Sequence, residues 1–220
     1  MKPIAYIHTE FPSKFGIPRQ SGLADTQGVI IFNEEYRNPE AFRGLEGFSH
    51  IWLLWEFSEA NRDTWQPTVR PPLLGGNKRM GVFATRSPFR PNSIGLSCVE
   101  LEKIEQTASH GTVLHVRGAD LMDGTPIYDV KPYLPYTDSH PYAKGGFTEN
   151  LGDTELDVVI PGGIDFPEEK LSVLTDILRQ DPRPHYINDP KRVYGFTFGG
   201  YEIKFNVKEK TLTVISAEKV

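Results

Sequence analysis

The sequence predicts a mainly β protein: a small closed β-barrel, or in the alternative a β-sandwich, followed by a smaller α+β domain at the carboxy terminus. The chain has 220 residues with 18 prolines and 20 glycines, which interrupt its first two-thirds too often for long helices. Between these interruptions lie short segments rich in β-branched and aromatic residues, without intervening helical patterns. This arrangement favours a barrel or sandwich over a parallel α/β sheet.

Seven strands are expected in the first part of the chain, separated by turns rich in Gly, Pro, Asn and Asp. They are residues 4–8, 28–32, 51–57, 81–85, 95–103, 112–117 and 127–130. A short helix is expected at residues 39–44, because Asn38 can cap it and Pro39 suits its first turn.

A change in composition predicts two domains, residues 1–145 and 146–220, because residues 136–153 are rich in Pro, Gly, Ser, Asp and Asn. The second domain should contain a helix capped near Asp165, where Pro167 and two acidic residues precede leucines at helical spacing. Residues 201–207 alternate between polar and apolar, and residues 211–216 run back after a three-residue turn. This pattern predicts a hairpin with one buried face.

Length, charge and cysteine content exclude several classes of protein. No apolar run approaches the ~20 residues of a membrane span and no signal peptide is visible, so we expect a cytoplasmic protein without a membrane partner. The lone Cys98 cannot form an internal disulfide or a thiolate zinc cluster.

Charge is unevenly distributed along the chain. The net charge of −5 argues against a general attraction to nucleic acid, yet residues 61–95 hold six basic residues and one acid. This basic run is either a solvated face balanced by nearby acids or a local phosphate-binding surface.

Several catalytic motifs are absent from the sequence. It contains no G-x-G-x-x-G after a strand, no P-loop, no G-x-S-x-G and no H-E-x-x-H, and its six histidines are scattered. A Rossmann enzyme, a P-loop enzyme, a serine hydrolase of the elbow type and a helical zinc enzyme are therefore not expected, and no metal is expected.

The segment GVFATRSPFRPNSIGLS at residues 81–97 places Arg86 and Arg90 in a turn stiffened by two prolines. Guanidinium groups bind carboxylates and phosphates, and a rigid turn loses little entropy when it holds a ligand. The plainer interpretation is a tight surface turn with two arginines. Its position in the basic run favours the ligand-binding interpretation.

The segment DLMDGTPIYDVKPY at residues 120–133 gathers three acids around a glycine turn. Asp123 followed by Gly124 is also an ordinary turn signal. Asp129 and Lys131 lie two residues apart on an expected strand, so they face the same side as either a surface ion pair or an acid–base pair for chemistry. A metal site is weakly supported here, because no histidines lie nearby.

These two segments, together with Pro18-Arg19-Gln20 and the stretch RGLEGFSHIW at residues 43–52, resemble the TrmO family, also called TsaA-like proteins, which are tRNA N6-methyltransferases. The resemblance spans most of residues 1–135 and continues in QDPRPHY at residues 180–186. It implies a small β-barrel that binds S-adenosylmethionine without a Rossmann sheet, a homodimer, and a small carboxy-terminal domain. It also implies the reaction, methylation of N6 of N6-threonylcarbamoyladenosine at position 37 of tRNA.

The resemblance carries over a set of cofactor-binding residues. They are Pro18, Arg19, Gln20, Ser58, Glu59, Arg86, Leu96, Asp120, Leu121, Met122 and Asp123. Asp120 or Asp123 could hold the ribose hydroxyls or the methionine amino group, and Arg86 could pair with the methionine carboxylate. Ser58 and Glu59 depart from the family in residue type, so contacts there would have to use the backbone.

Methyl transfer by displacement depends mainly on alignment, and an acceptor for the proton helps a weakly nucleophilic amine. Our hypothesis is that Asp129 supplies or orients that acceptor, with Lys131 shaping the local charge. The alternative is that water removes the proton afterwards.

The anticodon arm of tRNA is the expected partner, and its phosphates would meet cationic side chains. The candidates for these contacts are Lys78, Arg79, Arg90, Arg183 and Arg192. Trp65, Phe89 and Tyr186 are candidates for stacking on bases, although core packing is the commoner role of an aromatic residue.

Two other functions fit the same residues. One is a non-catalytic barrel module that binds RNA or the cofactor, and the other is a methyltransferase that acts on a different RNA base. An enzyme for a small molecule would leave the basic run without a role.

Overall fold

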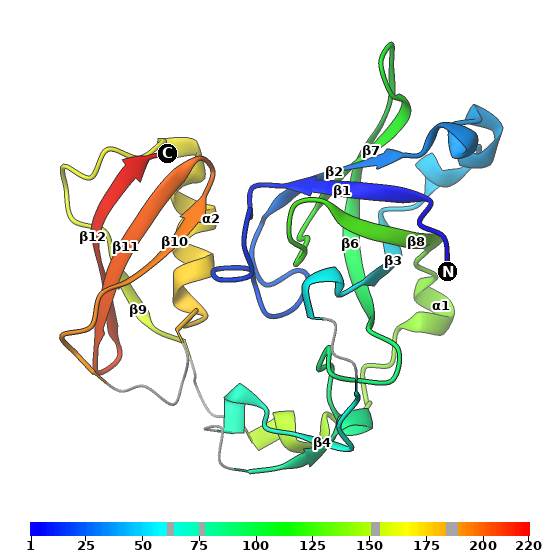
Figure 1. The fold of residues 1–220 in the computed structure, drawn as a ribbon. Helices are drawn as coiled ribbons and strands as arrows, with labels where there is room; N and C mark the ends of the chain where they lie inside the picture. Colours follow the sequence, from blue (N-terminus) through cyan, green and yellow to red (C-terminus); the bar gives the residue numbers. More distant parts are fainter. Residues whose placement is uncertain (61–63, 75–77, 151–154, 184–188) are drawn as a thin grey trace.

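The computed structural model describes residues 1–60, 64–74, 78–150, 155–183 and 189–220. Two β structures lie side by side, a barrel that holds the amino terminus and a sheet with a long helix that holds the carboxy terminus (Figure 1). The mainly β fold with a barrel and a smaller α+β region is therefore confirmed.

The barrel is closed by six antiparallel strands in the order β1-β2-β7-β6-β3-β8. The pairing of β1 with β8 completes the ring. Six of the seven expected segments coincide with these strands. Their bounds are β1 (Ala5–Thr9), β2 (Gln27–Phe32), β3 (His50–Glu56), β6 (Ile94–Thr107), β7 (Gly111–Arg117) and β8 (Thr125–Pro132).

Alternation along the strands fills the barrel. In β3, Ile51, Leu53 and Trp55 are buried while the residues between them face outward. They pack with Ile7, Ile30 and other apolar residues of neighbouring strands in one continuous core. A small barrel of this kind is filled by side chains, so a ligand has to bind at its ends or on its outer face.

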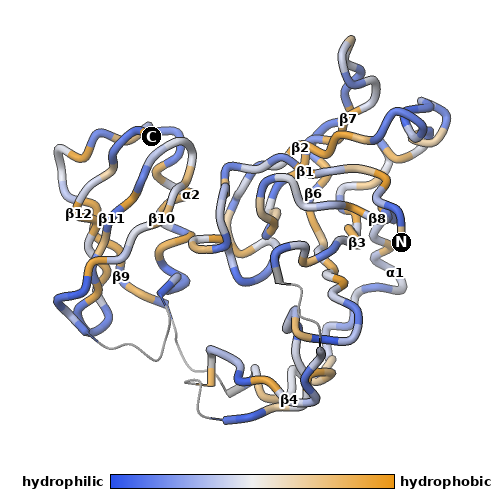
Figure 2. The backbone as a smooth tube through the Cα atoms, in the orientation of Figure 1, coloured by the Kyte–Doolittle hydropathy of each residue, from blue (hydrophilic) through white to orange (hydrophobic). Residues whose placement is uncertain are grey.

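The carboxy-terminal part is a four-stranded sheet in the order β10-β11-β12-β9, with one helix packed on it. The hairpin is confirmed, although its turn contains two residues, Glu209 and Lys210, instead of three. The elements are β9 (Asp157–Val159), α2 (Glu168–Arg179), β10 (Tyr194–Phe198), β11 (Tyr201–Lys208) and β12 (Thr211–Lys219). Figure 2 shows hydrophobic residues along the strands of both the barrel and this sheet.

Some local predictions were wrong. The segment 81–85 is not a strand: β5 (Met80–Gly81) pairs only with β4 (Thr68–Val69), and the chain then turns into the 3-10 helix Val82–Ala84. Asp165 does not cap α2, because Pro167 occupies the N-cap position without a side-chain hydrogen bond. The expected helix at 39–44 is a 3-10 helix, Pro39–Phe42, and Asn38 caps it by accepting a hydrogen bond from the Glu40 N–H.

The loop between β1 and β2 joins the two β structures. Phe11 and Ala24, at the two ends of this loop, are buried in the core of the carboxy-terminal sheet. The side-chain amide of Gln180 at the end of α2 donates to the Leu23 carbonyl (3.1 Å), and Lys170 forms an ion pair with Glu10. The division of the chain at residue 145 stays a prediction, since the second core includes residues from the first loop.

The short helix α1 (Pro135–Asp138) follows β8 and is held by Asp138, which accepts hydrogen bonds from Trp52 and from the Leu134 N–H. These bonds lower the pKa of Asp138, the backbone bond most. Over the described ranges, no helix is long and apolar enough to cross a membrane.

Candidate functional site

A large open cleft lies at one end of the barrel and extends to the carboxy-terminal part. The loop after β1, the end of β3, the turn at residues 83–90, the start of β6 and residues 120–122 form its barrel side. Pro182 and Arg183 contribute from the region after α2. Its volume of about 2310 Å³ exceeds the roughly 300–1,000 Å³ of a usual small-molecule pocket. The cleft therefore has room for a cofactor and for part of a larger substrate.

The cleft is electropositive although the whole chain is acidic. Eight basic side chains line it against three acidic ones, whereas the chain as a whole carries a charge of −5. The basic residues are Lys14, Arg19, Arg70, Arg79, Arg86, Arg90, Lys144 and Arg183, and the acidic residues are Glu56, Glu59 and Asp120. Because a concave surface concentrates the field of its charges, this cleft would attract phosphate groups.

The structure brings together ten of the eleven residues that the sequence predicted as cofactor ligands. The ten that line the cleft are Pro18, Arg19, Gln20, Ser58, Glu59, Arg86, Leu96, Asp120, Leu121 and Met122. They come from five separate segments, which only the closed barrel places around one space. Asp123 is not among the lining residues.

Asp120 is the acidic group that lies deepest in this arrangement. Its Oδ1 accepts a hydrogen bond from the Ser97 hydroxyl (2.5 Å), and the Ser97 oxygen accepts one from the Trp55 indole N–H (2.9 Å). Burial raises the pKa of Asp120, while the Ser97 hydrogen bond and the charge of Arg86 act in the opposite direction. Ser97 and Trp55 were not singled out from the sequence, where each reads as an ordinary strand residue.

The first loop places its polar groups next to Arg86. The Arg86 guanidinium donates to the side-chain oxygen of Gln20. Arg19 donates to the backbone carbonyl of Asp181 (2.7 Å), and burial lowers the pKa of Arg19 against the raising effect of the Asp181 charge. The predicted cofactor residue Arg19 is thus also a link between the cleft and the end of α2.

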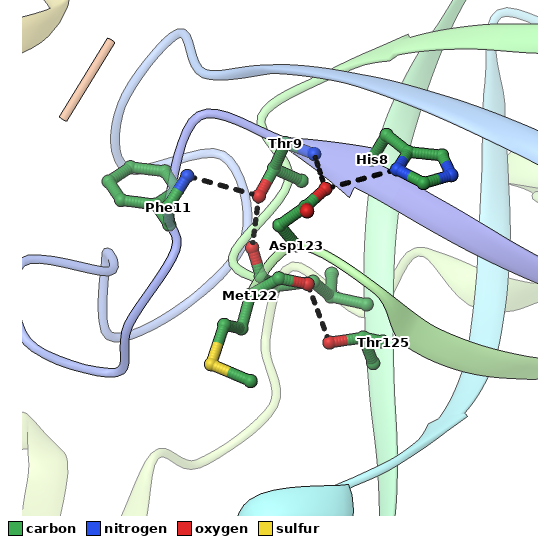
Figure 3. A network of polar contacts seen from close by, with 7 residues as sticks. His8, Thr9, Phe11, Met122, Asp123 and Thr125 are labelled. Carbon is green, nitrogen blue, oxygen red and sulfur yellow. Dashed lines mark hydrogen bonds and ion pairs between the residues drawn. The ribbon is translucent and has the colours of Figure 1, made fainter. Parts of the chain in front are cut away.

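Asp123 is bound to β1 (Figure 3). Its Oδ1 accepts from the Thr9 N–H (3.1 Å) and contacts His8 Nδ1 (3.2 Å). Thr9 in turn donates through its hydroxyl to the Leu121 carbonyl (3.0 Å), so strand β1 holds residues 121–123 from the side. This geometry favours the turn-forming role for Asp123, and its role in cofactor binding stays a prediction.

Asp129 and Lys131 form an ion pair of 3.0 Å on β8, as their spacing on one strand face predicted. Neither residue lines the cleft of its own chain. Both side chains are about half exposed, Asp129 at 43% and Lys131 at 63%. The structure therefore does not bring the predicted proton acceptor together with the predicted cofactor ligands in one chain.

The predicted tRNA-binding cations divide into two groups. Arg79, Arg90 and Arg183 line the cleft, where they also bind Thr68 Oγ1 (2.9 Å), the Thr85 carbonyl (3.1 Å) and Asp181 Oδ1 (2.9 Å) respectively. Lys78 and Arg192 are exposed and are not among the lining residues. Arg62 of the basic run and the stacking candidate Tyr186 lie outside the described residues.

An exposed aromatic pair lies beside the cleft. Phe83, a lining residue, is 72% exposed, and its ring stacks on Trp65, which is 47% exposed, at 6.1 Å between centroids. The sequence pointed to Trp65 but not to Phe83, because a strand at residues 81–85 would have given Phe83 a place in a sheet. In the parts of the chain that the structure covers, no group of three or more His, Cys, Asp or Glu side chains could hold a metal ion.

Comparisons with known proteins cover both parts of the chain. The pattern of the tRNA-methyltransferase O N-terminal domain matches residues 6–139, and that of the TrmO C-terminal domain matches residues 166–220. A "tRNA (adenine(37)-N6)-methyltransferase" of Escherichia coli K12 is 37% identical over 227 residues, covering 98% of this chain and 96% of the relative.

Two further matches come from Pseudomonas aeruginosa. One relative carries the provisional name of an S-adenosylmethionine-dependent methyltransferase and is 39% identical over 205 residues. The alignment covers 89% of this chain and 87% of the relative. A crystal structure of TrmO superposes with a TM-score of 0.80 at 32% identity, covering 99% of this chain and 95% of that one. With both family patterns matched in order and relatives aligned along nearly its whole length, the chain belongs to the TrmO family of tRNA methyltransferases.

Proposed function

We propose that this chain transfers a methyl group from S-adenosylmethionine to N6 of N6-threonylcarbamoyladenosine at position 37 of tRNA. The observation that carries the proposal is the cleft itself: ten predicted cofactor residues meet there in an electropositive surface with room for an RNA segment. The relatives named tRNA (adenine(37)-N6)-methyltransferases support the same reaction. Because tRNA is its substrate, we place the enzyme in the cytoplasm.

The residues of the cleft fit the chemistry of the cofactor. S-adenosylmethionine presents an ammonium group, a carboxylate, a ribose diol and an adenine, and when bound it supplies a methyl group on a positively charged sulfur. Asp120 can accept hydrogen bonds from the ammonium group or the ribose, and Arg86 can pair with the carboxylate. The backbone at Leu96 at the start of β6 is available to the adenine. Because these residues line the same cleft, they would hold the groups of the cofactor in fixed relative positions, as alignment for methyl transfer requires.

Discrimination between modified and unmodified tRNA tests the proposal. Purified protein is incubated with S-adenosylmethionine carrying a labelled methyl group and with tRNA that either contains or lacks the threonylcarbamoyl group. Label should enter only the first tRNA, at the adenine N6. Equal labelling of both tRNAs would support a methyltransferase for another base. Cofactor binding with no labelling of either would support a non-catalytic module.

Asp129 remains our proposed proton acceptor, with Lys131 as its charged neighbour. Because Asp129 lies outside the cleft of its own chain, this role requires that it face the cleft of a second subunit, and we propose a homodimer accordingly. In the wild type the Val130 N–H donates to Asp129 Oδ1 at 2.9 Å. An asparagine at position 129 has the same shape and its side-chain oxygen can still accept this hydrogen bond.

We expect Asp129→Asn to lower kcat by about 100-fold or more, because general base catalysis contributes roughly 10²–10⁴-fold. The KM for S-adenosylmethionine should be nearly unchanged. Turnover is measured with modified tRNA, and the oligomeric state by light scattering. Near-normal turnover, or a protein that is active as a monomer, would remove Asp129 from the mechanism and leave proton removal to water.

The aromatic pair next to the cleft is our candidate for stacking on a base of the anticodon loop. An exposed aromatic ring held by a second ring offers a ready platform for any base, worth about 1–3 kcal/mol per stacked base. Phe83→Ala should therefore raise the KM for tRNA by about tenfold while the affinity for S-adenosylmethionine stays constant. Tyr136→Ala is the matched control, since Tyr136 is 87% exposed and does not line the cleft. Equal changes in the two variants would contradict a stacking role for Phe83.

A further inference from the structure

The chain of hydrogen bonds beneath Asp120 has a fixed direction. An indole N–H can only donate, so the contact from Trp55 Nε1 to Ser97 Oγ (2.9 Å) makes the serine oxygen an acceptor. A serine hydroxyl has one proton, and with its oxygen engaged by Trp55 that proton points to Asp120 Oδ1 at 2.5 Å. Asp120 Oδ1, the last atom in this series of hydrogen bonds, must therefore accept, and the bond from Ser97 favours the ionised form of the carboxyl group.

The barrel core holds this chain in place. Trp55 is 6% exposed and Ser97 is 1% exposed, so neither side chain exchanges its partner for bulk water. Strands β3 and β6 pair in a register that sets Trp55 opposite Gly95 and Leu53 opposite Ser97. The Trp55 ring crosses the face of Gly95, where an added Cβ would lie only 2.2 Å from ring atom Cε2. A glycine at 95 is thus what lets the indole reach the serine.

Asp120 is the residue of this hydrogen-bonded series that can contact a ligand in the cleft. It lines the cleft together with Trp55, whereas Ser97 lies behind them. Among the charged side chains of the described residues, Arg86 is the one whose charge acts on the Asp120 carboxylate. The backbone N–H groups of Ser21 and of Asp120 itself also stabilise its ionised form. Within the part of the chain that the structure describes, Ser97 is therefore the side-chain hydroxyl that orients this carboxylate from the barrel interior.

We propose that Ser97 is a positioning residue, which, held by Trp55, orients the Asp120 carboxylate as an acceptor for the cationic or hydroxyl groups of S-adenosylmethionine. Ser97 acts only through Asp120 and does not touch the ligand. The inference rests on the proposed use of this cofactor, and it assigns to the barrel interior a role in ligand binding besides packing. Hydrogen bonds to charged groups are the stronger ones, so the loss of this hydroxyl should be measurable in binding.

The test is a double-mutant cycle on cofactor binding without tRNA. Affinity for S-adenosylmethionine is measured by calorimetry for the wild type, Ser97→Ala, Asp120→Asn and the double variant. We expect Ser97→Ala to weaken binding by about tenfold alone and to have a much smaller effect when Asp120 is already asparagine, because the charge that the hydroxyl orients is then gone. A similar loss in both backgrounds would show that Ser97 acts independently of Asp120 and would overturn the proposal.

The pH dependence of cofactor affinity is a second test, because it would not change if Ser97 served only to pack the barrel. Because the Ser97 hydrogen bond favours the ionised form of Asp120, its removal should shift the acidic limb of the binding profile to higher pH. The loss of affinity in Ser97→Ala should then be larger in mildly acidic buffer than in alkaline buffer. A loss that is constant across pH would contradict the orientation of an ionised carboxylate.

Two further variants keep the test interpretable. Trp55→Phe keeps an aromatic ring but removes the donor, and it should shift the acidic limb in the same direction by a smaller amount, even if Ser97→Ala folds poorly. Thr112→Val is the control for loss of a buried hydroxyl, because Thr112 is fully buried and accepts from Gln106 outside the cleft. It should lower Tm without changing affinity. A wild-type protein that does not bind S-adenosylmethionine would instead refute the proposed function, whereas normal binding by Ser97→Ala would refute this inference alone.

Discussion

Replacing Asp120 by asparagine is expected to weaken binding of S-adenosylmethionine by about 10- to 150-fold, which corresponds to the roughly 1.5–3 kcal/mol of a hydrogen bond to a charged group. Asparagine keeps an oxygen that can accept from Ser97, so the change removes the negative charge and little else. In this variant the positive charge of Arg86 would remain in the cleft, and the negative charge of Asp120 that opposes it would be gone. Calorimetry with the cofactor alone measures this effect without the RNA substrate.

The same substitution should not destabilise the free protein near neutral pH. Burial raises the pKa of Asp120 above its ordinary value of 3.8, so the folded protein holds this proton at a pH where the unfolded chain has released it. The free energy of unfolding therefore loses a contribution from Asp120 as pH rises from 3.8 through the raised pKa. Asparagine has no proton to release and avoids that loss. Asp120→Asn should consequently match or exceed the wild type in Tm at neutral pH while binding the cofactor poorly.

Asp123→Asn provides the comparison, because both acids belong to the same predicted cofactor segment. Asp123 binds the Thr9 N–H and contacts His8, so asparagine there can keep the backbone bond and should change cofactor affinity far less than Asp120→Asn. The expected order of affinities is wild type, then Asp123→Asn, then Asp120→Asn. If Asp123→Asn proves the weaker binder, the assignment of these two acids has to be exchanged.

The barrel was predictable because its strands follow simple local rules. In β3 five consecutive apolar residues lie between the polar residues His50 and Glu56, so a short buried strand could be read from the sequence. The alternation of its burial could not, because both of its faces carry apolar side chains. The segment at 81–85 has similar residue types, yet Val82 donates to the Pro67 carbonyl and the Thr85 N–H bonds back to Val82. Only the distant partner strand decides between these outcomes, and the sequence does not contain that information locally.

The sequence pointed to ten of the residues that line the cleft, but not to the residues that hold them in place. Polar residues in stiff turns, such as Arg86, are conspicuous because they add little to a core. Trp55 and Ser97 could not be recognised, since their contact depends on the register between β3 and β6, which places residues 42 positions apart in a hydrogen bond. The link between Arg19 and Asp181 joins residues 162 positions apart and likewise follows from packing alone.

Gly16→Ala should cause the largest loss of stability among the glycine substitutions in the first loop. Gly16 has a φ of +93°, and a Cβ there would lie 2.2 Å from ring atom Cδ2 of Phe196, which is 4% exposed in the core of the carboxy-terminal sheet. Alanine would lower the free energy of unfolding by about 1–2 kcal/mol through the left-handed backbone and by about 1–3 kcal/mol through overpacking. A total of about 2–5 kcal/mol is a large part of the ~5–15 kcal/mol that usually stabilises a folded domain.

Gly22→Ala isolates the two contributions. Gly22 belongs to the same loop and has a φ of +77°, but a Cβ there meets nothing within 4 Å. It should therefore lose only the backbone part, about 1–2 kcal/mol, when the free energy of unfolding is measured in urea. In the Gly16→Ala background, Phe196→Leu should recover part of the steric loss, because the smaller side chain leaves room for the new methyl group.

The same pair of variants tests whether the carboxy-terminal sheet positions the cofactor loop. Gly16 lies two residues before Pro18, and the loop continues through Arg19 and Gln20 into the cleft. Displacement of Gly16 from the Phe196 ring should move these residues, so Gly16→Ala should weaken binding of S-adenosylmethionine at temperatures where it is still folded, and Gly22→Ala should do so less. Equal affinities in the two variants would mean that the loop holds its cleft residues without the packing of Gly16 on Phe196.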